Sequence, residues 1–431
     1  MSNSNVSRRA FLRGPLVAAA GLAVVGRSAL GGPAQTPPSD TLAEAVIGTG
    51  GMGMGHVGMA KSGKSRLLAV CDADAKHLEN ALKQGGPSCT GYRDFRQVLD
   101  RGDIDVVHVP TPPHWHALIS IAAAEAGCDV FCEKPMTRTI GEGRHVIDAV
   151  QRNGRMFRLN TWFRLHDGLY GLGCEAKPVK KLVANGLLGW PLTVIVAPWT
   201  GFGWKVSMWS GQTNQAPQPI PADLDYNMWL GPAPCKPYHP HRVHGSFRGY
   251  WDYDGGGLAD MGQHYLDPVQ YILGKDDTSP VEIEAVAPWP THDDACGLWG
   301  RVEMKYADGC RLILETGEWG TPTTQGAPYI EGPKGKIFPG FRTDPPDLKD
   351  ALASLPDPEP MISDFYVSVT TRQKFGLNEV NGNRSNMLVH LANCAIRTGR
   401  KLKFDPDKQL FVDDPEANRL IHQPMRAPWR L

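Results

Sequence analysis

The sequence predicts an α/β protein with a doubly wound parallel sheet in its first half and a further sheet in its second half. Two observations predict the first half. From Ala43 to about Leu159, short apolar runs alternate with segments of helical character, and a glycine-rich turn follows the first run. The prediction for the second half rests on partly alternating apolar runs, which are typical of a sheet with one exposed face.

The glycine-rich turn has the pattern of a nucleotide-binding loop. Gly48 would allow a tight turn, Gly50 would let a pyrophosphate approach the backbone, and Gly53 would let the following helix lie close to the sheet. Gly51 and Met52 complete this predicted cradle. Because the chain contains 48 glycines, the pattern alone is weak evidence, and its context has to support it.

The next apolar run supplies that context, because it ends in an acidic residue. Arg66-Leu-Leu-Ala-Val-Cys-Asp72 places Asp72 19 residues after Gly53, where an adenosine ribose is expected. A carboxylate at this place binds ribose hydroxyls and repels the 2′-phosphate of NADP. The sequence therefore predicts NAD in preference to NADP.

The charges of the chain are balanced. There are 45 Lys and Arg against 45 Asp and Glu among 431 residues, which gives a formal net charge of zero. No global field attracts nucleic acid or an anionic membrane, so we expect a small-molecule partner, no nucleic acid and no stable membrane span. The length predicts two or three domains.

The N-terminus resembles a twin-arginine export signal. Ser7-Arg-Arg-Ala-Phe-Leu-Arg13 precedes an apolar, uncharged run over residues 14–26. That run is too short for an ordinary transmembrane helix, and a basic tail before a short buried helix is the alternative. We expect residues 1–40 to be signal and linker, and the protein to be exported to the periplasm or another extracytoplasmic space by the twin-arginine machinery. Whether the signal is cleaved stays open.

Two loops follow predicted strands and are expected at the carboxyl edge of the sheet, where ligands bind. They are Pro110-Thr-Pro-Pro-His-Trp-His116 and Glu133-Lys-Pro135. Together with the glycine turn, Asp72 and a later Asp260-Met-Gly-Gln-His264 piece, they resemble the Gfo/Idh/MocA family, which includes glucose–fructose oxidoreductase and inositol dehydrogenase. The resemblance runs from about Ala43 to the C-terminus.

The resemblance implies a Rossmann domain over residues 41–160 and an α+β domain over residues 161–431. The second domain would contain a large open, mostly antiparallel sheet that binds substrate and mediates homodimers or homotetramers. The C-terminal segments Lys401–Asp405 and Pro424–Trp429 are expected to pack back on the first domain. The implied cofactor-binding residues, beyond the glycine cradle and Asp72, are Thr111, Pro112, His116, Glu133 and Lys134.

Lys134, Asp260 and His264 are the predicted catalytic residues. Oxidation of a secondary alcohol needs a group that takes the hydroxyl proton and donors for the developing oxyanion. On a helix Asp260, His264 and Asp267 can share one face, and a histidine beside a carboxylate suits proton transfer near neutral pH. We expect His264 to be the general base, Lys134 a donor and relay, and Asp260 a partner of the substrate or of His264. The roles of Lys134 and His264 stay interchangeable.

The second half offers candidate substrate residues. Residues 199–257 form a long loop-rich insertion, dense in Trp, Tyr, His and Pro, and loops of this length are usually functional. No metal is predicted, because His239, His241 and His244 fit no standard zinc spacing, and their roles stay open. Core packing is the alternative for each aromatic candidate. The predicted substrate-binding residues are Lys134, Trp162, Arg164, Trp204, Tyr253, Asp260 and His264.

The leading functional hypothesis is an exported NAD-dependent oxidoreductase that takes a hydride from a secondary hydroxyl of a sugar, cyclitol or glycoside. One alternative is a redox-neutral glycosidase, as in glycoside hydrolase family 109, which oxidises a sugar carbon transiently with tightly bound, recycled NAD. A compartment without free NAD favours that alternative. Another alternative is a non-catalytic sensor of sugar and dinucleotide, against which the intact Lys134, Asp260 and His264 argue.

Overall fold

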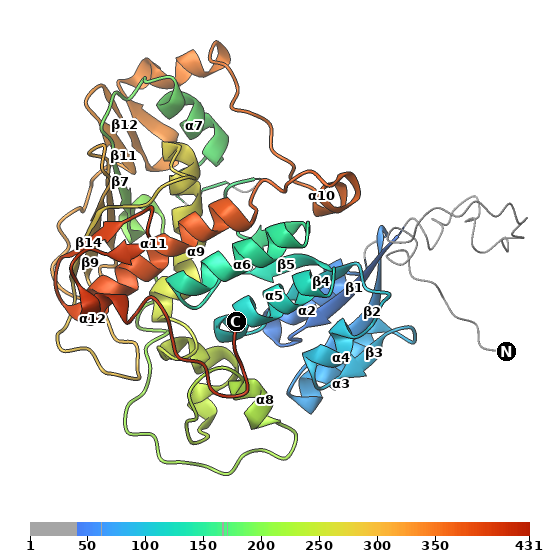
Figure 1. Ribbon diagram of the computed structural model, residues 1–431. Helices are drawn as coiled ribbons and strands as arrows, with labels where there is room; N and C mark the ends of the chain where they lie inside the picture. The colour runs from blue at the N-terminus through green and yellow to red at the C-terminus, as the bar shows by residue number, and fades with distance from the viewer. Residues whose placement is uncertain (1–40, 62, 166–167, 170) are drawn as a thin grey trace, which may run out of the picture.

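The computed structural model describes residues 41–431 except 62, 166–167 and 170, so the predicted export signal lies outside the described residues. Two sheets, one in each half of the chain, are separated by helices (Figure 1). No helix in the described part of the chain is long and apolar enough to cross a membrane.

The first sheet has six parallel strands in the order β3-β2-β1-β4-β5-β6. This order changes direction beside β1, which is the arrangement of a dinucleotide-binding sheet, and it brings the carboxyl ends of β1, β4 and β5 to one edge. The predicted doubly wound sheet is therefore confirmed. Its strands are β1 (Leu42–Ile47), β2 (Ser65–Cys71), β3 (Thr90–Tyr92), β4 (Val106–Val109), β5 (Asp129–Glu133) and β6 (Phe157–Asn160).

Five helices join these strands, and side chains cap the first turns of α3, α4 and α6. Asp94 accepts a hydrogen bond from the backbone N–H of Arg96 (3.0 Å), so the helix begins at Phe95. Tyr92 ends strand β3 and lies outside this helix. The helices are α2 (Gly51–Met59), α3 (Ala75–Gly85), α4 (Phe95–Leu99), α5 (His116–Glu125) and α6 (Ile140–Arg152).

The second sheet has nine strands and is mostly antiparallel, as expected. The order is β13-β12-β11-β7-β10-β9-β8-β14-β15, in which β7 and β10 form the parallel pair. Val302 and Met304 of β9 are buried and alternate with more exposed neighbours, so one face of the sheet is covered. The strands are β7 (Thr193–Val196), β8 (Glu282–Val286), β9 (Arg301–Lys305), β10 (Arg311–Glu315), β11 (Ile330–Gly332), β12 (Gly335–Phe338), β13 (Arg342–Asp344), β14 (Leu402–Asp405) and β15 (Leu410–Phe411).

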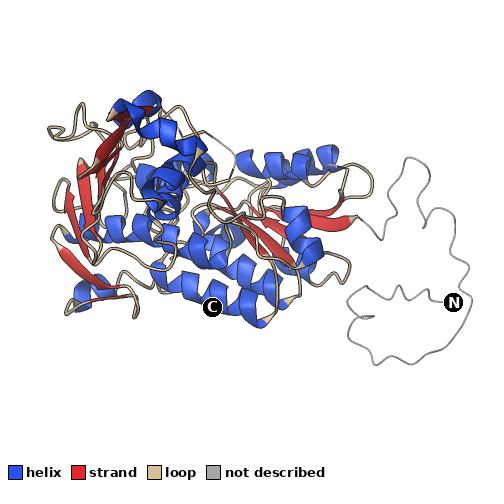
Figure 2. Cartoon of the chain, turned by 90° about the horizontal axis from the view of Figure 1, so that it is seen from above, coloured by secondary structure: helices blue, strands red, loops and turns tan. Residues whose placement is uncertain are grey.

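Helices lie between the two sheets (Figure 2), and the two longest of those described are α9 (Gly256–Leu273) and α11 (Glu379–Thr398), which are labelled in Figure 1. Every residue of α9 is buried. A helix buried all round fixes its polar side chains in place, because each must find a partner or face a cavity. This helix carries the predicted Asp260 and His264.

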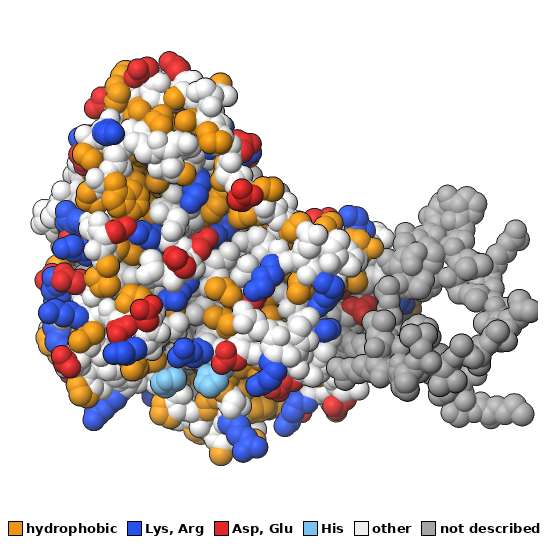
Figure 3. Space-filling model, turned by 45° about the horizontal axis from the view of Figure 1, so that its top comes forward, with side chains coloured by type: hydrophobic (Ala, Val, Ile, Leu, Met, Phe, Trp, Pro, Cys, Tyr) orange, Lys and Arg blue, Asp and Glu red, His pale blue; other side chains and the backbone are white. Residues whose placement is uncertain are grey.

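The long insertion between β7 and α9 has an apolar cluster of its own. Tyr226 and Trp229 of α8 (Tyr226–Leu230) pack in it with Tyr238, Tyr250 and Tyr253. The segment around α8 lies below the first sheet in Figure 1. On the face of the molecule shown in Figure 3, acidic and basic side chains are interspersed.

The C-terminal segments divide between the two halves. Trp429 packs on the first domain, with its ring centroid 4.8 Å from that of Trp115 and 6.1 Å from that of Phe95. The expectation for residues 401–405 is wrong, because they form β14 and pair with β8 in the second sheet. The remaining helices are α7 (Ala176–Ala184), α10 (Phe365–Thr371) and α12 (Pro415–Asn418).

Candidate active site

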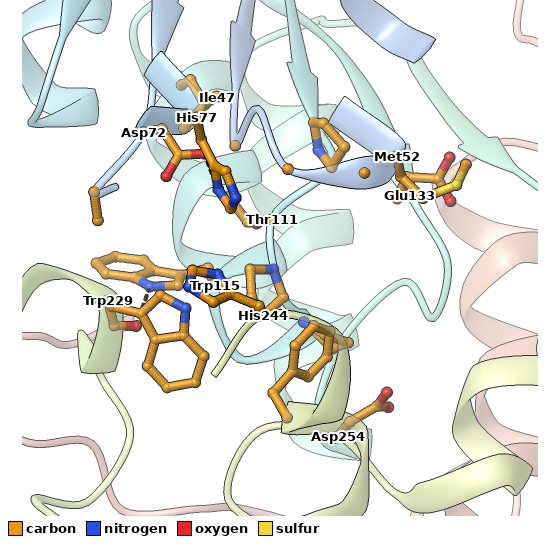
Figure 4. Close-up of a pocket in the computed structure, with 18 of the residues that line it drawn as sticks. Ile47, Met52, Asp72, His77, Thr111, Trp115, Glu133, Trp229, His244 and Asp254 are labelled. Atoms are coloured by element: carbon orange, nitrogen blue, oxygen red, sulfur yellow. Dashed lines mark hydrogen bonds and ion pairs between the residues drawn. The ribbon is translucent and has the colours of Figure 1, made fainter. Parts of the chain in front are cut away.

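A cavity of about 560 Å³ lies at the carboxyl edge of the first sheet (Figure 4). Three parts of the chain line it: the segments after β1, β2, β3, β4 and β5, the insertion, and the beginning of α9. Its place beside the switch in strand order is where dinucleotides bind in such sheets. The predicted site residues that line it are Gly48, Gly50, Gly51, Met52, Asp72, Thr111, Pro112, Glu133, Lys134 and Asp260.

The glycine turn has the geometry of a phosphate cradle. Gly48 has a φ of +95°, and a Cβ on it would lie 2.8 Å from the Cγ2 atom of Thr111. A Cβ on Gly53 would lie only 2.0 Å from the carbonyl oxygen of Gly48. No side chain caps the first turn of α2, and nothing lies within 4 Å of a Cβ placed on Gly51. The N-terminus of α2 therefore offers free N–H groups to the cavity, which fits a pyrophosphate.

Asp72 lies at the end of β2, with its carboxylate already oriented. Its Oδ2 accepts hydrogen bonds from the backbone N–H (2.6 Å) and the hydroxyl (3.1 Å) of Thr49, and its Oδ1 accepts one from the N–H of Asp74 (2.8 Å). Burial alone would raise the pKa of Asp72, but hydrogen bonds from His77, Asp74 and Thr49 outweigh it and hold the pKa below its ordinary value. The group is therefore an anion, which suits a ribose diol and disfavours a phosphate.

Two predicted cofactor residues lie behind the cavity wall. His116 is 1% exposed, and its ring nitrogens face the carbonyl oxygens of Pro135 (2.6 Å) and Thr111 (2.7 Å). It therefore positions the two loops instead of touching a ligand, and this corrects its predicted contact role. Gly53 is likewise buried under Gly48 and acts through close packing.

Lys134 and Asp260 meet across the two domains. The Nζ atom of Lys134 donates to the carboxylate (3.0 Å) and to the carbonyl oxygen (2.6 Å) of Asp260. The same Oδ1 atom accepts a hydrogen bond from the Nε atom of Arg248 (2.7 Å), which the insertion supplies. Burial would raise the pKa of Asp260, but the charges of Lys134 and Arg248 hold it well below its usual range. A buried anion thus holds two cations at the cavity.

Glu133, beside Lys134, is held by a buried chain of polar groups. Its Oε1 atom faces the Nε2 atom of His56 (3.0 Å) and accepts from Asn160 (2.6 Å). The Nδ1 atoms of His56 and His108 face one another (2.9 Å), and the Nε2 atom of His108 faces Glu44 (2.7 Å). Burial would raise the pKa of Glu133, but His56 and the charges nearby lower it to about 2. Glu133 therefore stays ionised at the cavity wall.

His264 is buried one helical turn beyond Asp260 and is not among the residues that line the cavity. Its ring stacks on Trp162, with the centroids 3.7 Å apart and the planes 11° apart. Its Nδ1 atom has no hydrogen-bond partner among the described residues. Burial and the charge of Lys134 lower the pKa of His264 well below its ordinary value, so the ring is neutral. Trp162 thus holds the ring of His264 in place by stacking on it.

Three predicted substrate residues belong to the protein core instead, which is a correction. Arg164 is 4% exposed and binds Asp267 (2.8 Å) and Asp276 (2.6 Å), so Asp267 is also unavailable as a partner of His264. The indole N–H of Trp204 donates to the carbonyl oxygen of Val196. Tyr253 is fully buried in the cluster of the insertion. None of Arg164, Trp204 and Tyr253 lines the cavity.

The histidines of the insertion have different places. His239 accepts a hydrogen bond from the N–H of His241, whose ring faces the hydroxyl of Tyr250 (2.7 Å). Only His244 reaches the cavity, where its Nε2 atom lies 3.5 Å from the Oδ2 atom of Asp74. Potential metal-ligand atoms of Asp74, His77 and His244 lie within 4.8 Å of one another. The absence of a metal stays a prediction.

Several lining residues were missed by the sequence analysis. Arg248 and Asp254 bring charge to the cavity from the insertion, while Trp115 and Trp229 form an aromatic wall (Figure 4). The indole N–H of Trp115 donates to the carbonyl oxygen of Trp229 (3.1 Å), which ties the loop after β4 to the insertion. The signal for Asp254 was present, since it directly precedes the three glycines that lead to Asp260.

Family comparisons agree with this architecture. Residues 42–161 match the model described as the NAD-binding Rossmann fold of an oxidoreductase family, and residues 172–431 match that of its C-terminal alpha/beta domain. Inositol 2-dehydrogenase of Salmonella typhimurium is 30% identical over 128 residues, which are 30% of this chain and 36% of that protein. A glycosyl hydrolase family 109 protein of Shewanella baltica is 36% identical over 94 residues, 20% of each chain. The chain thus spans about a third or less of the length of these curated relatives.

Solved structures share the fold. The WlbA dehydrogenase of Bordetella pertussis, in complex with NADH and UDP-GlcNAcA, has a TM-score of 0.59 at 18% identity, covering 85% of this chain and 99% of that one. The myo-inositol 2-dehydrogenase of Lactobacillus plantarum has a TM-score of 0.52 at 17% identity, covering 85% and 100%. The fold class, the enzyme class and NAD as cofactor are confirmed. The chain belongs to the Gfo/Idh/MocA family of NAD-binding oxidoreductases.

Proposed function

We propose that the protein oxidises a secondary hydroxyl of a carbohydrate or cyclitol and keeps its NAD bound while it does so. The contact between Lys134 and Asp260 carries this proposal, because it places a proton-handling group from the first domain against a carboxylate of the second at the cavity. Bound NAD would be held by the glycine turn and Asp72, and it supplies the acceptor for the hydride.

Lys134 is the group best placed to contact the substrate hydroxyl. It lines the cavity and is fixed by Asp260, so its remaining N–H can point to the oxygen on which charge develops. His264, whose pKa the charge of Lys134 helps to lower, is neutral, and its Nδ1 atom has no partner among the described residues, so it would be a second acceptor for the proton. Asp260 stays ionised and orients Lys134 and Arg248.

The insertion supports retention of the cofactor, because it is fastened to the first domain beside Asp72. The backbone N–H of Ala75 donates to the carbonyl oxygen of Asp223, and the N–H of Asp225 donates to that of Ala73, both at 2.9 Å. His244, Phe247 and Arg248 of the same insertion line the cavity. A nucleotide along the glycine turn would thus be covered by the chain on two sides.

We therefore predict that the purified protein carries NAD(H) through gel filtration. His244→Ala should speed release of the nucleotide by roughly tenfold, because it removes one contact at the mouth of the cavity. His239→Ala is the control, since His239 lies outside the lining. The measurement is nucleotide content before and after extensive dialysis, and protein that is free of nucleotide after gentle purification would contradict retention.

Incubation with a panel of polyols and glycosides tests the activity itself. Absorbance of reduced nicotinamide and release of free sugar are followed together. Net reduced cofactor supports a dehydrogenase, and free sugar without reduced cofactor supports the redox-neutral glycosidase, which similarity to glycosyl hydrolase family 109 proteins favours as the second candidate. If the protein turns over none of these compounds, both candidate functions are contradicted.

Export and assembly are parts of the proposal that rest on other observations. The twin-arginine motif over residues 7–13 supports an extracytoplasmic location. A retained cofactor suits such a location, because no free NAD is supplied there. The resemblance to the family supports a homodimer or homotetramer formed through the second sheet.

A further inference from the structure

Three side chains that can bind a metal ion meet at the mouth of the cavity. Asp74 and His77 lie at the beginning of α3 in the first domain, and His244 belongs to the insertion. One ligand atom from each residue lies within 4.8 Å of the other two. His77 and His244 also line the cavity and are labelled in Figure 4. Imidazole nitrogen and carboxylate oxygen are common ligands of Zn²⁺, so the set has the chemistry of a zinc site.

The spacing of the donor atoms fits one ion between them. The Nε2 atom of His244 lies 3.5 Å from the Oδ2 atom of Asp74, which is longer than an ordinary hydrogen bond. Two ligand atoms of a tetrahedral zinc ion, each about 2.0–2.1 Å from the metal, are about 3.4 Å apart. The ring centroids of His77 and His244 are 4.9 Å apart, with the planes at 66° to one another. Both imidazoles are therefore close enough to Asp74 to share an ion with it.

Asp74 turns one oxygen toward this site, because its other oxygen caps helix α3. Its Oδ1 atom accepts hydrogen bonds from the backbone N–H groups of Lys76 (2.8 Å) and His77 (3.3 Å), while its Oδ2 atom faces His244. The side chain of Lys76 forms its ion pair with Asp223 (2.5 Å) instead of with Asp74. The carboxylate of Asp74 therefore keeps an oxygen for a cation.

Asp72 adds a carboxylate behind His77. The Nδ1 atom of His77 lies 3.7 Å from the Oδ2 atom of Asp72, whose hydrogen bond raises the pKa of His77. A histidine that binds a metal usually donates its other ring N–H to a carboxylate in this way, which leaves Nε2 as the ligand atom. The positive end of α3 disfavours a cation, but it carries only about half a charge, against two carboxylates from Asp72 and Asp74.

His244 is held in an unusual backbone conformation. Its φ is +55°, in the left-handed region that residues other than glycine rarely adopt, and such conformations cluster at functional sites. The insertion is fastened nearby, because Leu224 forms an isolated β-bridge with Asp74. Burial and the charge of His77 lower the pKa of His244, so its ring is neutral, as a metal ligand has to be.

We propose that Asp74, His77 and His244 bind one Zn²⁺, which fastens the insertion to the first domain beside Asp72 and holds the nucleotide in the cavity. Three protein ligands leave the fourth position of the ion to water. The site would replace the absence of a metal that the sequence predicts. Binding of zinc is independent of the proposed function, and only its effect on the nucleotide rests on the proposed retention of NAD.

Zinc binding is tested on the full protein, produced without a histidine tag and stripped with a chelator. Titration with zinc chloride, followed by metal analysis, should show a tight site in the wild type that is weakened by about 100-fold in His77→Ala and His244→Ala, since loss of even an outer partner costs about 10–100-fold. Asp74→Asn still caps α3 and should lose at least about tenfold. His239→Ala, in the same insertion but outside the lining, should bind zinc like the wild type.

Release of the nucleotide gives the second readout. A chelator should speed release of NAD(H) from the wild type by about tenfold, to the rate of His244→Ala, and added zinc should restore slow release. The chelator should leave the rate of His244→Ala unchanged, because that variant has already lost the ion.

The two readouts separate the possible failures. A wild type that binds zinc no more tightly than His77→Ala and His244→Ala would overturn the site. Zinc binding at these residues with no effect of the chelator on nucleotide release would overturn the fastening role. A purified protein without nucleotide contradicts the proposed retention of NAD, and in that case the titration alone confirms or overturns the zinc site.

Discussion

Replacing Lys134 by methionine is expected to lower kcat by about a thousandfold, while the protein stays folded and keeps its nucleotide. The substitution preserves the length of the side chain but removes the ammonium group that lies against Asp260 and faces the cavity. Losses of this size are typical when a group that transfers a proton or stabilises a developing oxyanion is removed. The measurement is single-turnover reduction of the bound cofactor by the best substrate of the panel.

The matched control is Lys64→Met. Lys64 also forms an ion pair, with Asp364 at 3.2 Å, but its side chain is 62% exposed and far from the lining of the cavity. Exposed ion pairs contribute little, so activity and stability should both stay close to wild type. A Lys134→Met protein with wild-type turnover would remove Lys134 from the mechanism.

Gly53→Ala is expected to destabilise the protein by about 3 kcal/mol and to abolish retention of NAD. The added methyl group would lie 2.0 Å from the carbonyl oxygen of Gly48, so helix α2 has to move away from the turn. Such a movement shifts the N–H groups that are to hold the pyrophosphate. Chemical unfolding and nucleotide content measure the two effects.

Gly55→Ala, two residues further along α2, provides the control. Nothing lies within 4 Å of a Cβ on this exposed glycine. Exchange of Gly for Ala inside a helix stabilises by about 0.5–1 kcal/mol, so this variant should be slightly more stable than wild type and should retain NAD. Equal behaviour of the two variants would show that close packing at Gly53 is unimportant.

Local patterns in the sequence were sufficient to predict the first domain and its cofactor cradle. The turn at Gly48 and the carboxylate of Asp72 are tied to strand ends a few residues away, so their places follow from the alternation of strands and helices. The meeting of Lys134 with Asp260 could be predicted only through the family resemblance, because 126 residues separate them.

The substrate-binding residues were harder to predict, because an aromatic residue in a long loop can contact a ligand or pack in a hydrophobic core. Trp204 and Tyr253 were predicted to contact a sugar, but Trp204 is buried in the core of the second domain and Tyr253 in the apolar cluster of the insertion. Arg164 satisfies two carboxylates, which no local pattern reveals. Conversely, Arg248 became apparent as a cavity residue only once the chain was folded.

The insertion lines the cavity together with the glycine turn, so bound NAD would be an internal component of the protein. Trp115, Trp229 and Met228 face it from one side and the glycine turn from the other, so a molecule without NAD would expose apolar surface from both domains to water. Binding restricted to the folded form adds directly to its stability. The melting temperature of a preparation would then report how completely it is loaded, and molecules that never acquired NAD would be the first to be lost to proteolysis.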